Sequence, residues 1–167
     1  MADLRADILQ ELTRTRDVIR ANMQSQKVNA TGRTSASLRV VNGETNLRLI
    51  AGNSETHDLQ TPYGNVQVWN TAPWASVEIG QKPSAYPKGF YYIIKQWSRD
   101  KGIQFNTESE RSTFAYFAAK KIVREGTERY RVPIDVYSTA TAQAVMNIID
   151  ICGIWARDFI HNTDINF

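Results

Sequence analysis

The stretch over residues 79–103, IGQKPSAYPKGFYYIIKQWSRDKGI, decides how the middle of this 167-residue chain folds. Its two prolines restrict their own φ angles and favour extended conformations in the residues before them. From Pro87 onward, apolar side chains recur at helical spacing, and Lys101-Gly102 is typical of a helix C-terminus. The stretch therefore predicts a stiff elbow over 80–92 that leads into a helix ending at Lys101.

The residues before the elbow predict a helix and then a β-hairpin. Apolar residues of 2–23 fall on one stripe of an amphipathic helix, and 29–37 is turn-like. Two β-type runs, 37–41 and 46–51, flank the strong turn signal Asn42-Gly43. An exposed loop follows over 52–65, and NVQVW over 65–69 alternates like a third strand. The pattern of 71–80 fits a short helix or a strand equally well.

The residues after the elbow predict a second long helix, an extended segment and a last helix. Thr107 and Glu110 have the spacing of a capping box, and Gly126 is a stop signal. The segment over 129–137 reads as an edge or irregular strand, because it contains a proline. Ser138 is expected to cap the last helix, and 161–167 is expected to be a short C-terminal tail.

This order of elements predicts an α+β fold. We expect a small, mainly antiparallel β-sheet packed against the N-terminal helix and two to three further helices. The length suits a single domain over 1–167. The apolar positions at strand and helix spacing predict a core that contains Leu38, Leu47, Ile93, Trp97, Phe117, Ile122, Val145 and Trp155.

Charge is unevenly distributed along the chain. The net charge is +3, but the 82–131 segment holds 11 basic and 5 acidic residues and so carries +6. Such a separation can steer docking between proteins or contact phosphate. The single cysteine, Cys152, allows no internal disulfide, which fits a reducing compartment. The first residues lack the apolar segment of a signal peptide, and no apolar run approaches the roughly 20 residues that span a bilayer.

Residues suited to catalysis are scarce and scattered. His57-Asp58 would suit a metal-dependent hydrolase, but nothing near it in the sequence completes a ligand set. Cys152 lies on the apolar stripe of the last helix, as a buried small hydrophobe does, and His161 lies near the end of that helix. Phosphate-binding glycine motifs are absent. We therefore expect no enzyme activity, no cofactor and no metal site.

Nucleic acid is an alternative partner. The predicted helix after the elbow interleaves aromatic residues with Lys95, Arg99 and Lys101, which could stack on bases and contact phosphates. The same apolar residues are needed to bury the helix, so a solvated basic face is the simpler interpretation. A small basic DNA- or RNA-binding protein that uses 82–131 remains the alternative to a structural role.

Four short motifs carry a resemblance to a known family. They resemble, in order and spacing over roughly 30–127, the neck or tail-completion (head–tail joining) proteins of tailed bacteriophages. The family pattern combines an N-terminal helix, a Thr-Gly-basic turn, a glycine–basic–proline elbow and two helices with characteristic ends. The matching positions are Thr31-Gly32-Arg33, Gly80-Gln81-Lys82-Pro83, Trp97 with Lys101-Gly102-Ile103, and Ile122 with Gly126-Thr127.

The resemblance implies a structural virion protein that is assembled in the host cytoplasm. The family joins the portal, or head connector, to the tail, and its members form rings around the DNA exit channel. The implied partners are copies of the chain itself, portal and tail proteins, and DNA in the channel through non-specific contact, but no membrane. The 52–65 loop and the 80–92 elbow are the expected contact regions. The interface candidates are Thr31, Gly32, Arg33, Gly80, Lys82, Pro83, Pro87, Tyr91 and Tyr92.

Overall fold

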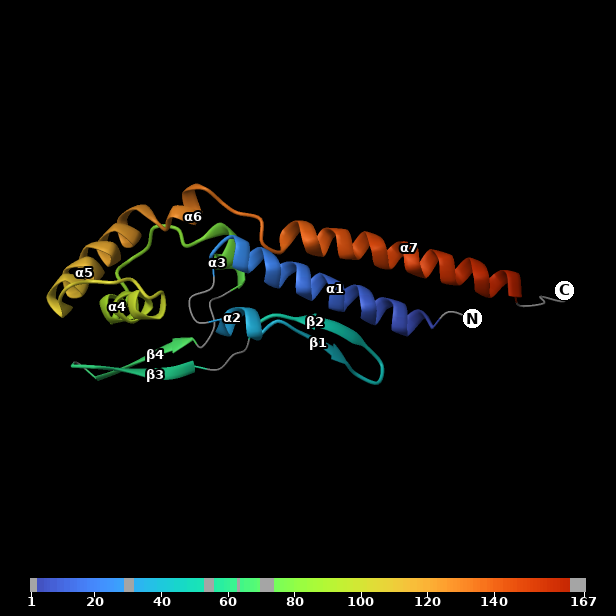
Figure 1. The fold of residues 1–167 in the computed structure, drawn as a ribbon, viewed down its shortest axis with the longest axis horizontal. Helices are drawn as coiled ribbons and strands as arrows, with labels where there is room; N and C mark the ends of the chain where they lie inside the picture. The colour runs from blue at the N-terminus through green and yellow to red at the C-terminus, as the bar shows by residue number, and fades with distance from the viewer. Residues whose placement is uncertain (1–2, 29–31, 53–55, 63, 70–73, 163–167) are drawn as a thin grey trace.

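The protein is elongated, and its longer helices and its hairpins form two halves (Figure 1). The computed structural model describes residues 3–28, 32–52, 56–62, 64–69 and 74–162. One half, called here the α1–α7 half, contains the two longest helices and a β-hairpin. The other, the α4–α5 half, contains two shorter helices and a second hairpin. The α+β class predicted from the sequence is confirmed, but the strands form two separate two-stranded sheets instead of one.

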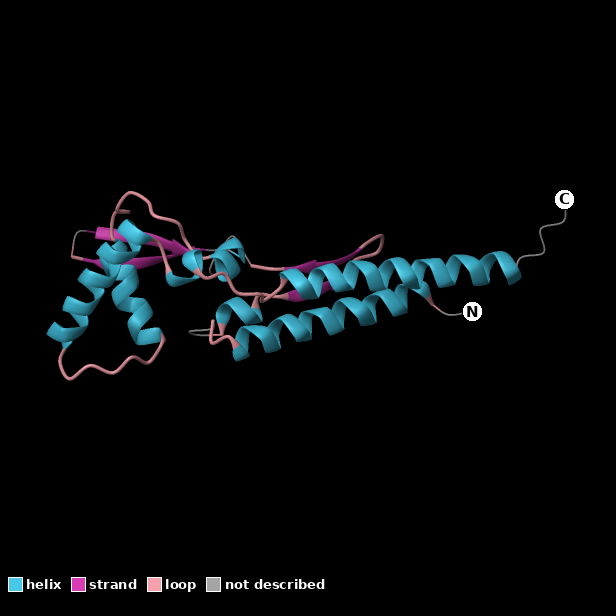
Figure 2. Cartoon of the chain, turned by 90° about the horizontal axis from the view of Figure 1, so that it is seen from above, coloured by secondary structure: helices cyan, strands magenta, loops and turns pink. Residues whose placement is uncertain are grey.

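Helix α1, Leu4–Ser25, confirms the predicted N-terminal helix. The Asp3 side chain caps it by accepting hydrogen bonds from the backbone N–H groups of Arg5 and Ala6 at 3.0 and 3.3 Å. Helix α7, Ser138–Asn162, runs antiparallel beside it (Figure 2). Because α7 extends to Asn162, the predicted tail begins later than residue 161; residues 163–167 lie outside the described part of the chain.

The predicted hairpin near Asn42-Gly43 is confirmed. Strands β1, Arg39–Asn42, and β2, Leu47–Ile50, pair antiparallel with Asn42 opposite Leu47. The Gly43 N–H donates to the carbonyl of Asn46 at 2.9 Å and closes the turn. The short helix α2, Arg33–Ala36, precedes the hairpin. The hairpin lies against α1, so it covers a face of that helix that α7 leaves open.

The prediction of a loop over 52–65 is wrong. Strands β3, Thr56–Thr61, and β4, Gly64–Trp69, form a second antiparallel hairpin, and residues 53–55 and 63 lie outside the described part. The sequence gives little indication of this hairpin, because β3 is largely polar and because Pro62 and Gly64 are both typical of loops. In the structure Pro62 is the first residue of the two-residue connection, a common length for a β-hairpin, and Gly64 is the first residue of β4.

The ends of the two helices in the α4–α5 half follow the predicted signals. Helix α4, Phe90–Asp100, begins slightly after Pro87, whose carbonyl accepts a hydrogen bond from the Phe90 N–H at 3.1 Å. It ends at Gly102, with φ +68°, in a Schellman motif. Helix α5, Glu108–Glu125, is capped by the Thr107 hydroxyl and ends at Gly126, as predicted.

Two short helices join the halves. The undecided segment over 71–80 contains α3, Trp74–Ile79, while residues 71–73 lie outside the described part. The predicted strand over 129–137 is wrong, because α6, Glu128–Arg131, occupies its start and residues 132–137 form no strand. An acidic residue at the first position of α6 and arginines at its end suit the dipole of a short helix.

Ser138 is the first residue of α7, and the capping role predicted for it is taken by Glu78 of α3. The Glu78 carboxylate accepts hydrogen bonds from the backbone N–H groups of 136–138.

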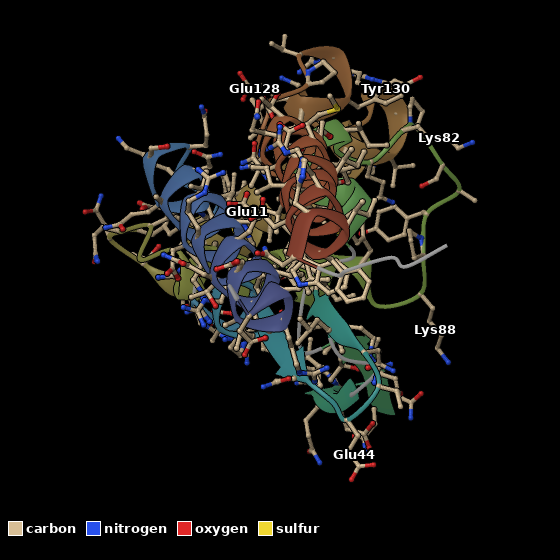
Figure 3. All side chains as sticks on the ribbon, turned by 90° about the vertical axis from the view of Figure 1, so that its right-hand side faces the viewer. Glu11, Glu44, Lys82, Lys88, Glu128 and Tyr130 are labelled. Carbon is tan, nitrogen blue, oxygen red and sulfur yellow. The ribbon has the colours of Figure 1, made fainter. Side chains whose placement is uncertain are left out.

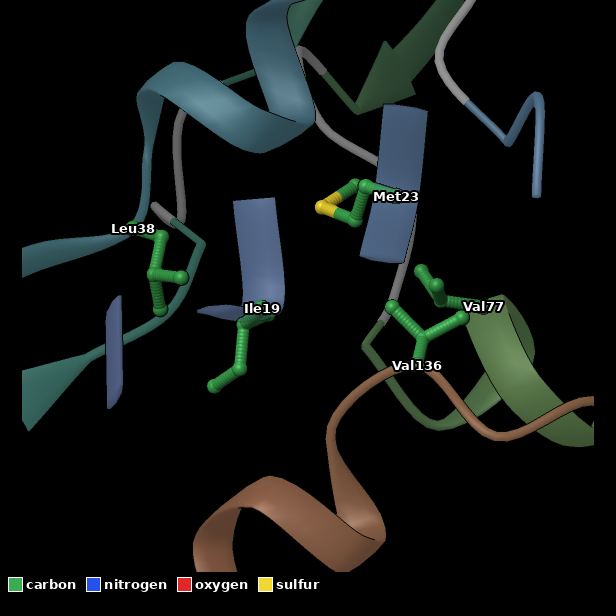
Figure 4. Packing of buried hydrophobic residues seen from close by; sticks show 5 residues of the cluster. All are labelled: Ile19, Met23, Leu38, Val77 and Val136. Carbon is green, nitrogen blue, oxygen red and sulfur yellow. The ribbon is translucent and has the colours of Figure 1, made fainter. Parts of the chain in front are cut away.

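Each half has its own buried cluster. In the α1–α7 half, side chains from α1, α3 and the segments before β1 and α7 converge; the five buried members are Ile19, Met23, Leu38, Val77 and Val136 (Figure 4). In the α4–α5 half the buried members are Phe90, Ile94, Ala115 and Ala119. The structure therefore builds two small cores in place of the single one expected.

The predicted core is partly wrong. Leu38 is buried as predicted, and four further members are half-buried: Leu47, Ile93, Ile122 and Trp155. Three are exposed in the single chain: Trp97 (41%), Phe117 (63%) and Val145 (57%). Helix α5 turns its alanines toward α4, since small residues let two helices approach closely, and this turns Phe117 outward. Helix α7 is apolar around most of its circumference, and one neighbouring helix covers only part of it.

Candidate functional site: the elbow and the cleft beside it

The elbow, residues 80–92, starts as an extended and exposed segment whose two ends are fixed by glycines. Gly80 has φ +65°, and a Cβ there would lie 2.5 Å from the backbone nitrogen of Tyr130 in α6. Gly89 has φ +75°, and a Cβ there would lie 2.6 Å from Val66 Cγ2 of β4. Real Cβ atoms essentially never show such distances, and both φ angles are positive, so both positions favour glycine.

Backbone hydrogen bonds hold the first half of the elbow against the end of α5. The Thr127 N–H donates to the Gln81 carbonyl at 2.9 Å, and the Gln81 N–H donates to the Thr127 hydroxyl at 2.9 Å. The Ser84 N–H donates to the carbonyl of Val123 at 3.1 Å. Gly126, with φ +77°, leaves no room for a Cβ beneath Pro83. Two motifs more than 40 residues apart in sequence, 80–83 and 122–127, therefore form one contact.

The outer side of the elbow faces solvent. Lys82 and Lys88 point away from the rest of the chain (Figure 3), and Pro83 and Pro87 are exposed. Of the interface candidates, Lys82, Pro83 and Pro87 are thus available to a partner, whereas Gly80 shapes the fold. The half-buried candidates Tyr91 and Tyr92 contact each other edge to face, with ring centroids 4.8 Å apart.

The other two motifs meet where the halves join. Gly32 has φ +77° at the start of α2, and Arg33 forms an ion pair with Asp100 of α4 at 3.5 Å. The Lys101 ammonium donates to the carbonyl of Lys27, just after α1, at 2.7 Å. Thr31 lies outside the described residues. The motif around 31–33 and the motif around 97–103 therefore connect the α1–α7 half to the α4–α5 half.

A cleft of about 530 Å³ lies beside the elbow, between α4, α5, α6 and the residue Val28. Its apolar walls come mainly from Phe90, Ile94, Trp97, Phe114 and Ile122. The charged residues that line it are Lys101, Lys121, Glu128, Arg129 and Arg131, so cations outnumber the one carboxylate. The exposed side of Trp97 faces this cleft, which accounts for its absence from the core.

Two of the cations that line the cleft, Lys101 and Arg129, are partly desolvated. Burial lowers the pKa of Lys101, and the positive charge of Arg129 lowers it further. Burial also lowers the pKa of Arg129, against a smaller opposite effect of Glu128. Among the residues that the structure describes, no carboxylate forms an ion pair with Arg129 or Lys121, whereas Arg131 pairs with Glu125 at 3.8 Å. A negatively charged group in the cleft would therefore be stabilised.

Helix α7 presents a continuous apolar stripe to solvent. Seven exposed residues recur at helical spacing on one face and none is charged; this α7 stripe comprises Ala142, Val145, Met146, Ile149, Gly153, Ala156 and Ile160. Helix α5 exposes an aromatic pair, Tyr116 and Phe117, in edge-to-face contact at 5.4 Å. Apolar surface of this extent marks places where another molecule binds.

Groups suited to catalysis do not converge. Cys152 is half-buried on α7, and His161 is exposed in its last turn. His57 pairs through its backbone with Val68 in the β3–β4 hairpin. Within the described ranges, no group of three or more His, Cys, Asp or Glu side chains could hold a metal ion. None of the helices described is both long and apolar enough to cross a membrane.

Sequence reasoning missed the cleft and the capping role of Glu78. The charge of +6 over 82–131 was a usable signal, but it could not show which cations would gather around one cleft. Glu78 carries no local signal, because its partners lie about 60 residues away. Comparisons of the chain with protein-family models, with curated proteins and with solved structures find no match.

Proposed function

We propose that the protein is a structural virion protein of a tailed bacteriophage, which forms a ring in the neck and joins the portal of the head to the tail. The observation that carries the proposal is the ordered set of four motifs, whose residues take part in two contacts that shape the molecule. One is the contact of the elbow with the end of α5, and the other is the junction around Arg33 and Asp100.

The exposed surfaces support a role in assembly. The α7 stripe and the Tyr116–Phe117 pair leave large apolar side chains open to water in the single chain. Neighbouring subunits in a ring would cover such surfaces, since the centre of a protein–protein interface is apolar and aromatic. The elbow, stiffened by two prolines, adds a preorganised surface that loses little conformational entropy when a partner binds.

In this role the protein acts by binding alone. Copies of the chain form the ring, and the elbow and the apolar helix faces contact neighbours, the portal above and the tail proteins below. The protein needs no cofactor or metal, performs no reaction, and resides in the virion. The cations of the 82–131 segment allow non-specific contact with DNA that passes through the ring.

Particles made with and without this protein test the proposal. A phage that cannot produce the chain should give filled heads and separate tails, and addition of the purified protein should restore joined, infectious particles. Mass spectrometry of purified virions should find the chain, and electron microscopy should place it in the neck. Complete particles without the protein, or its absence from virions, would contradict the proposal.

A small basic DNA- or RNA-binding protein is the second candidate, because Lys101, Lys121 and Arg129 gather around a cleft with the exposed face of Trp97. Such a protein should bind oligonucleotides with an affinity that falls steeply as salt rises. Fluorescence anisotropy with single- and double-stranded oligonucleotides over a salt series measures this. Ring formation without any binding to nucleic acid would eliminate this candidate.

A further inference from the structure

The molecule has two ends of opposite charge. The cleft lies in the α4–α5 half, in the 82–131 segment that carries +6, whereas the rest of the chain carries −3. The far end of the α1–α7 half contains the first turn of α1, the turn of the β1–β2 hairpin and the last turns of α7 (Figure 1). In these three segments Asp3, Asp7, Glu44 and Asp158 outnumber Arg5 and Arg157.

The last turns of α7 end in exposed apolar side chains. Ile160 is 59% exposed and completes the α7 stripe, and Phe159 beside it is also exposed. The Phe159 ring stacks on Trp155 with centroids 5.3 Å apart, which holds it in place. The formal charges of Arg157 and Asp158 in these turns cancel, but the last carbonyl groups of a helix carry a partial negative charge. The end of α7 thus combines apolar surface with the partial negative charge of a helix C-terminus.

The cleft has the matching properties. Aromatic and aliphatic walls surround a space of a size that commonly holds ligands, and cations line it. Lys101 and Arg129 are partly removed from water, so they interact more strongly with an approaching negative group than solvated cations would. Apolar side chains flanked by negative charge are therefore a suitable occupant.

The end of α7 cannot enter the cleft of its own chain. Helix α7 starts near the middle of the molecule and runs away from the α4–α5 half for 25 residues, about 37 Å (Figure 1). The cleft and the end of α7 consequently lie at opposite ends. Two different surfaces that fit each other but cannot meet within one chain produce a head-to-tail contact between copies.

We infer that the far end of one copy, led by Phe159 and Ile160 of α7, docks into the cleft between α4, α5 and α6 of the next copy. This inference deepens the proposed function and rests on the self-assembly that it includes. It assigns the contact to two different surfaces, so each subunit uses its cleft toward one neighbour and its α7 end toward the other.

The test uses two variants, each of which disables one of the two surfaces. I160K places a cation at the end of α7, and the pair K121E and R129E reverses charge in the cleft. Each should raise the apparent dissociation constant of self-association roughly tenfold or more, measured by analytical ultracentrifugation over a concentration series. The control is I154K, at a 51% exposed position on another face of α7. It should associate like the native chain.

Mixing the two disabled variants separates this contact from a symmetric one. Each retains one intact surface, so an equimolar mixture should form a one-to-one dimer and nothing larger. A mixture that stays monomeric would overturn the inference, and so would variants that associate as well as the native chain. If the variants associate as well as the native chain, another surface forms the ring and the proposed neck function is unaffected. A native chain that never associates would also overturn this inference, and the experiment on phage particles would then test the neck function on its own.

A photo-crosslinking amino acid at position 160 of the otherwise native chain gives a readout that does not depend on the stability of the variants. Mass spectrometry should find cross-links from this position to 90–131 of another copy. Cross-links confined to α1 or α7 of another copy would overturn the inference. Loss of oligonucleotide binding in the K121E and R129E variant, with normal self-association, would assign the cleft to nucleic acid instead.

Discussion

At the scale of single residues, Glu78 connects parts of the chain that are distant in sequence. Its buried carboxylate accepts hydrogen bonds from the backbone N–H groups of Val136 and Ser138, each at 2.8 Å, and from the Ser138 hydroxyl. Burial raises the pKa of Glu78, but the hydrogen bonds from Ser138 and from the backbone of 136–138 outweigh it, so the pKa is lowered. One side chain of α3 thus holds the first turn of α7.

Glu78→Gln should lower the free energy of unfolding by about 1–2 kcal/mol at pH 7, because hydrogen bonds to a charged acceptor become neutral ones. A lowered pKa stabilises the fold above the unfolded-state pKa of about 4.3, and this contribution disappears as the pH falls through the folded-state pKa. The difference between the two proteins should therefore shrink in acid. Urea denaturation between pH 7 and pH 3 measures it, and a constant difference would contradict this role.

Trp97→Ala should lower the free energy of unfolding by about 2–3 kcal/mol, because Trp97 is 41% exposed and the rest of its surface is buried. A tryptophan in the core would lose about 3–5 kcal/mol. Ile94→Ala, one turn earlier and buried, should lose about 2–5 kcal/mol and serves as the comparison. Equal losses of stability in the two variants, measured by chemical denaturation, would show that Trp97 belongs to the core.

At the scale of secondary-structure elements, the contact of the elbow with the end of α5 depends on glycine. Gly80→Ala should lower the free energy of unfolding by about 2–4 kcal/mol, from the left-handed backbone and from overlap with the Tyr130 backbone. Gly102→Ala is the matched control, since Gly102 has nearly the same φ and no neighbour within 4 Å of a Cβ. It should lose about 1–2 kcal/mol. Similar losses in both would show that the close approach is unimportant.

The elbow should matter more for assembly than for folding. Replacing Pro83 and Pro87 by alanine should change monomer stability by about 1–2 kcal/mol at most, because both prolines are exposed. Self-association should weaken roughly fivefold or more, since the freed segment must be ordered on binding. Thermal unfolding and analytical ultracentrifugation measure the two effects. Normal rings from the double variant would contradict a stiffening role for the prolines.

The elements that the sequence predicts well are those with local signals. Gly102, Gly126 and Thr107 end or begin helices through hydrogen bonds to residues a few positions away, so their roles are visible in the sequence. Strand β3 was missed because its polar residues lack the alternation of a half-buried strand. The exposed face of α5 was predicted wrongly because two helical faces carry apolar residues, and only the approach of α4 decides between them.

At the scale of the whole molecule, two small buried clusters are joined by few contacts. The described connections include the Arg33–Asp100 ion pair and the hydrogen bond from Lys101 to the Lys27 carbonyl. The cleft forms where these connections bring Val28, which follows α1, close to α4, α5 and α6. The sequence could indicate a basic segment but not this cleft, because the cleft depends on contacts between residues far apart in the chain.

The two halves should open separately. Ile94→Ala should reduce hydrogen-exchange protection mainly in α4 and α5, because Ile94 belongs to the buried cluster of that half. Ile19→Ala should instead act mainly on α1 and α7. Hydrogen exchange followed by mass spectrometry resolves the two patterns. Uniform loss of protection over the whole chain in both variants would show one cooperative unit and would support the predicted single domain over 1–167.

The elbow packs closely against α6 at Gly80 and against β4 at Gly89. The direction in which its outer surface points, relative to the rest of the subunit, is therefore fixed. When identical subunits join through two different surfaces, each step turns the next subunit by a fixed rotation. A full circle closes only if that rotation divides 360° evenly; otherwise the subunits continue into a helical fibre. Small changes near these glycines would therefore appear as altered ring sizes or as open filaments, even where every subunit is folded.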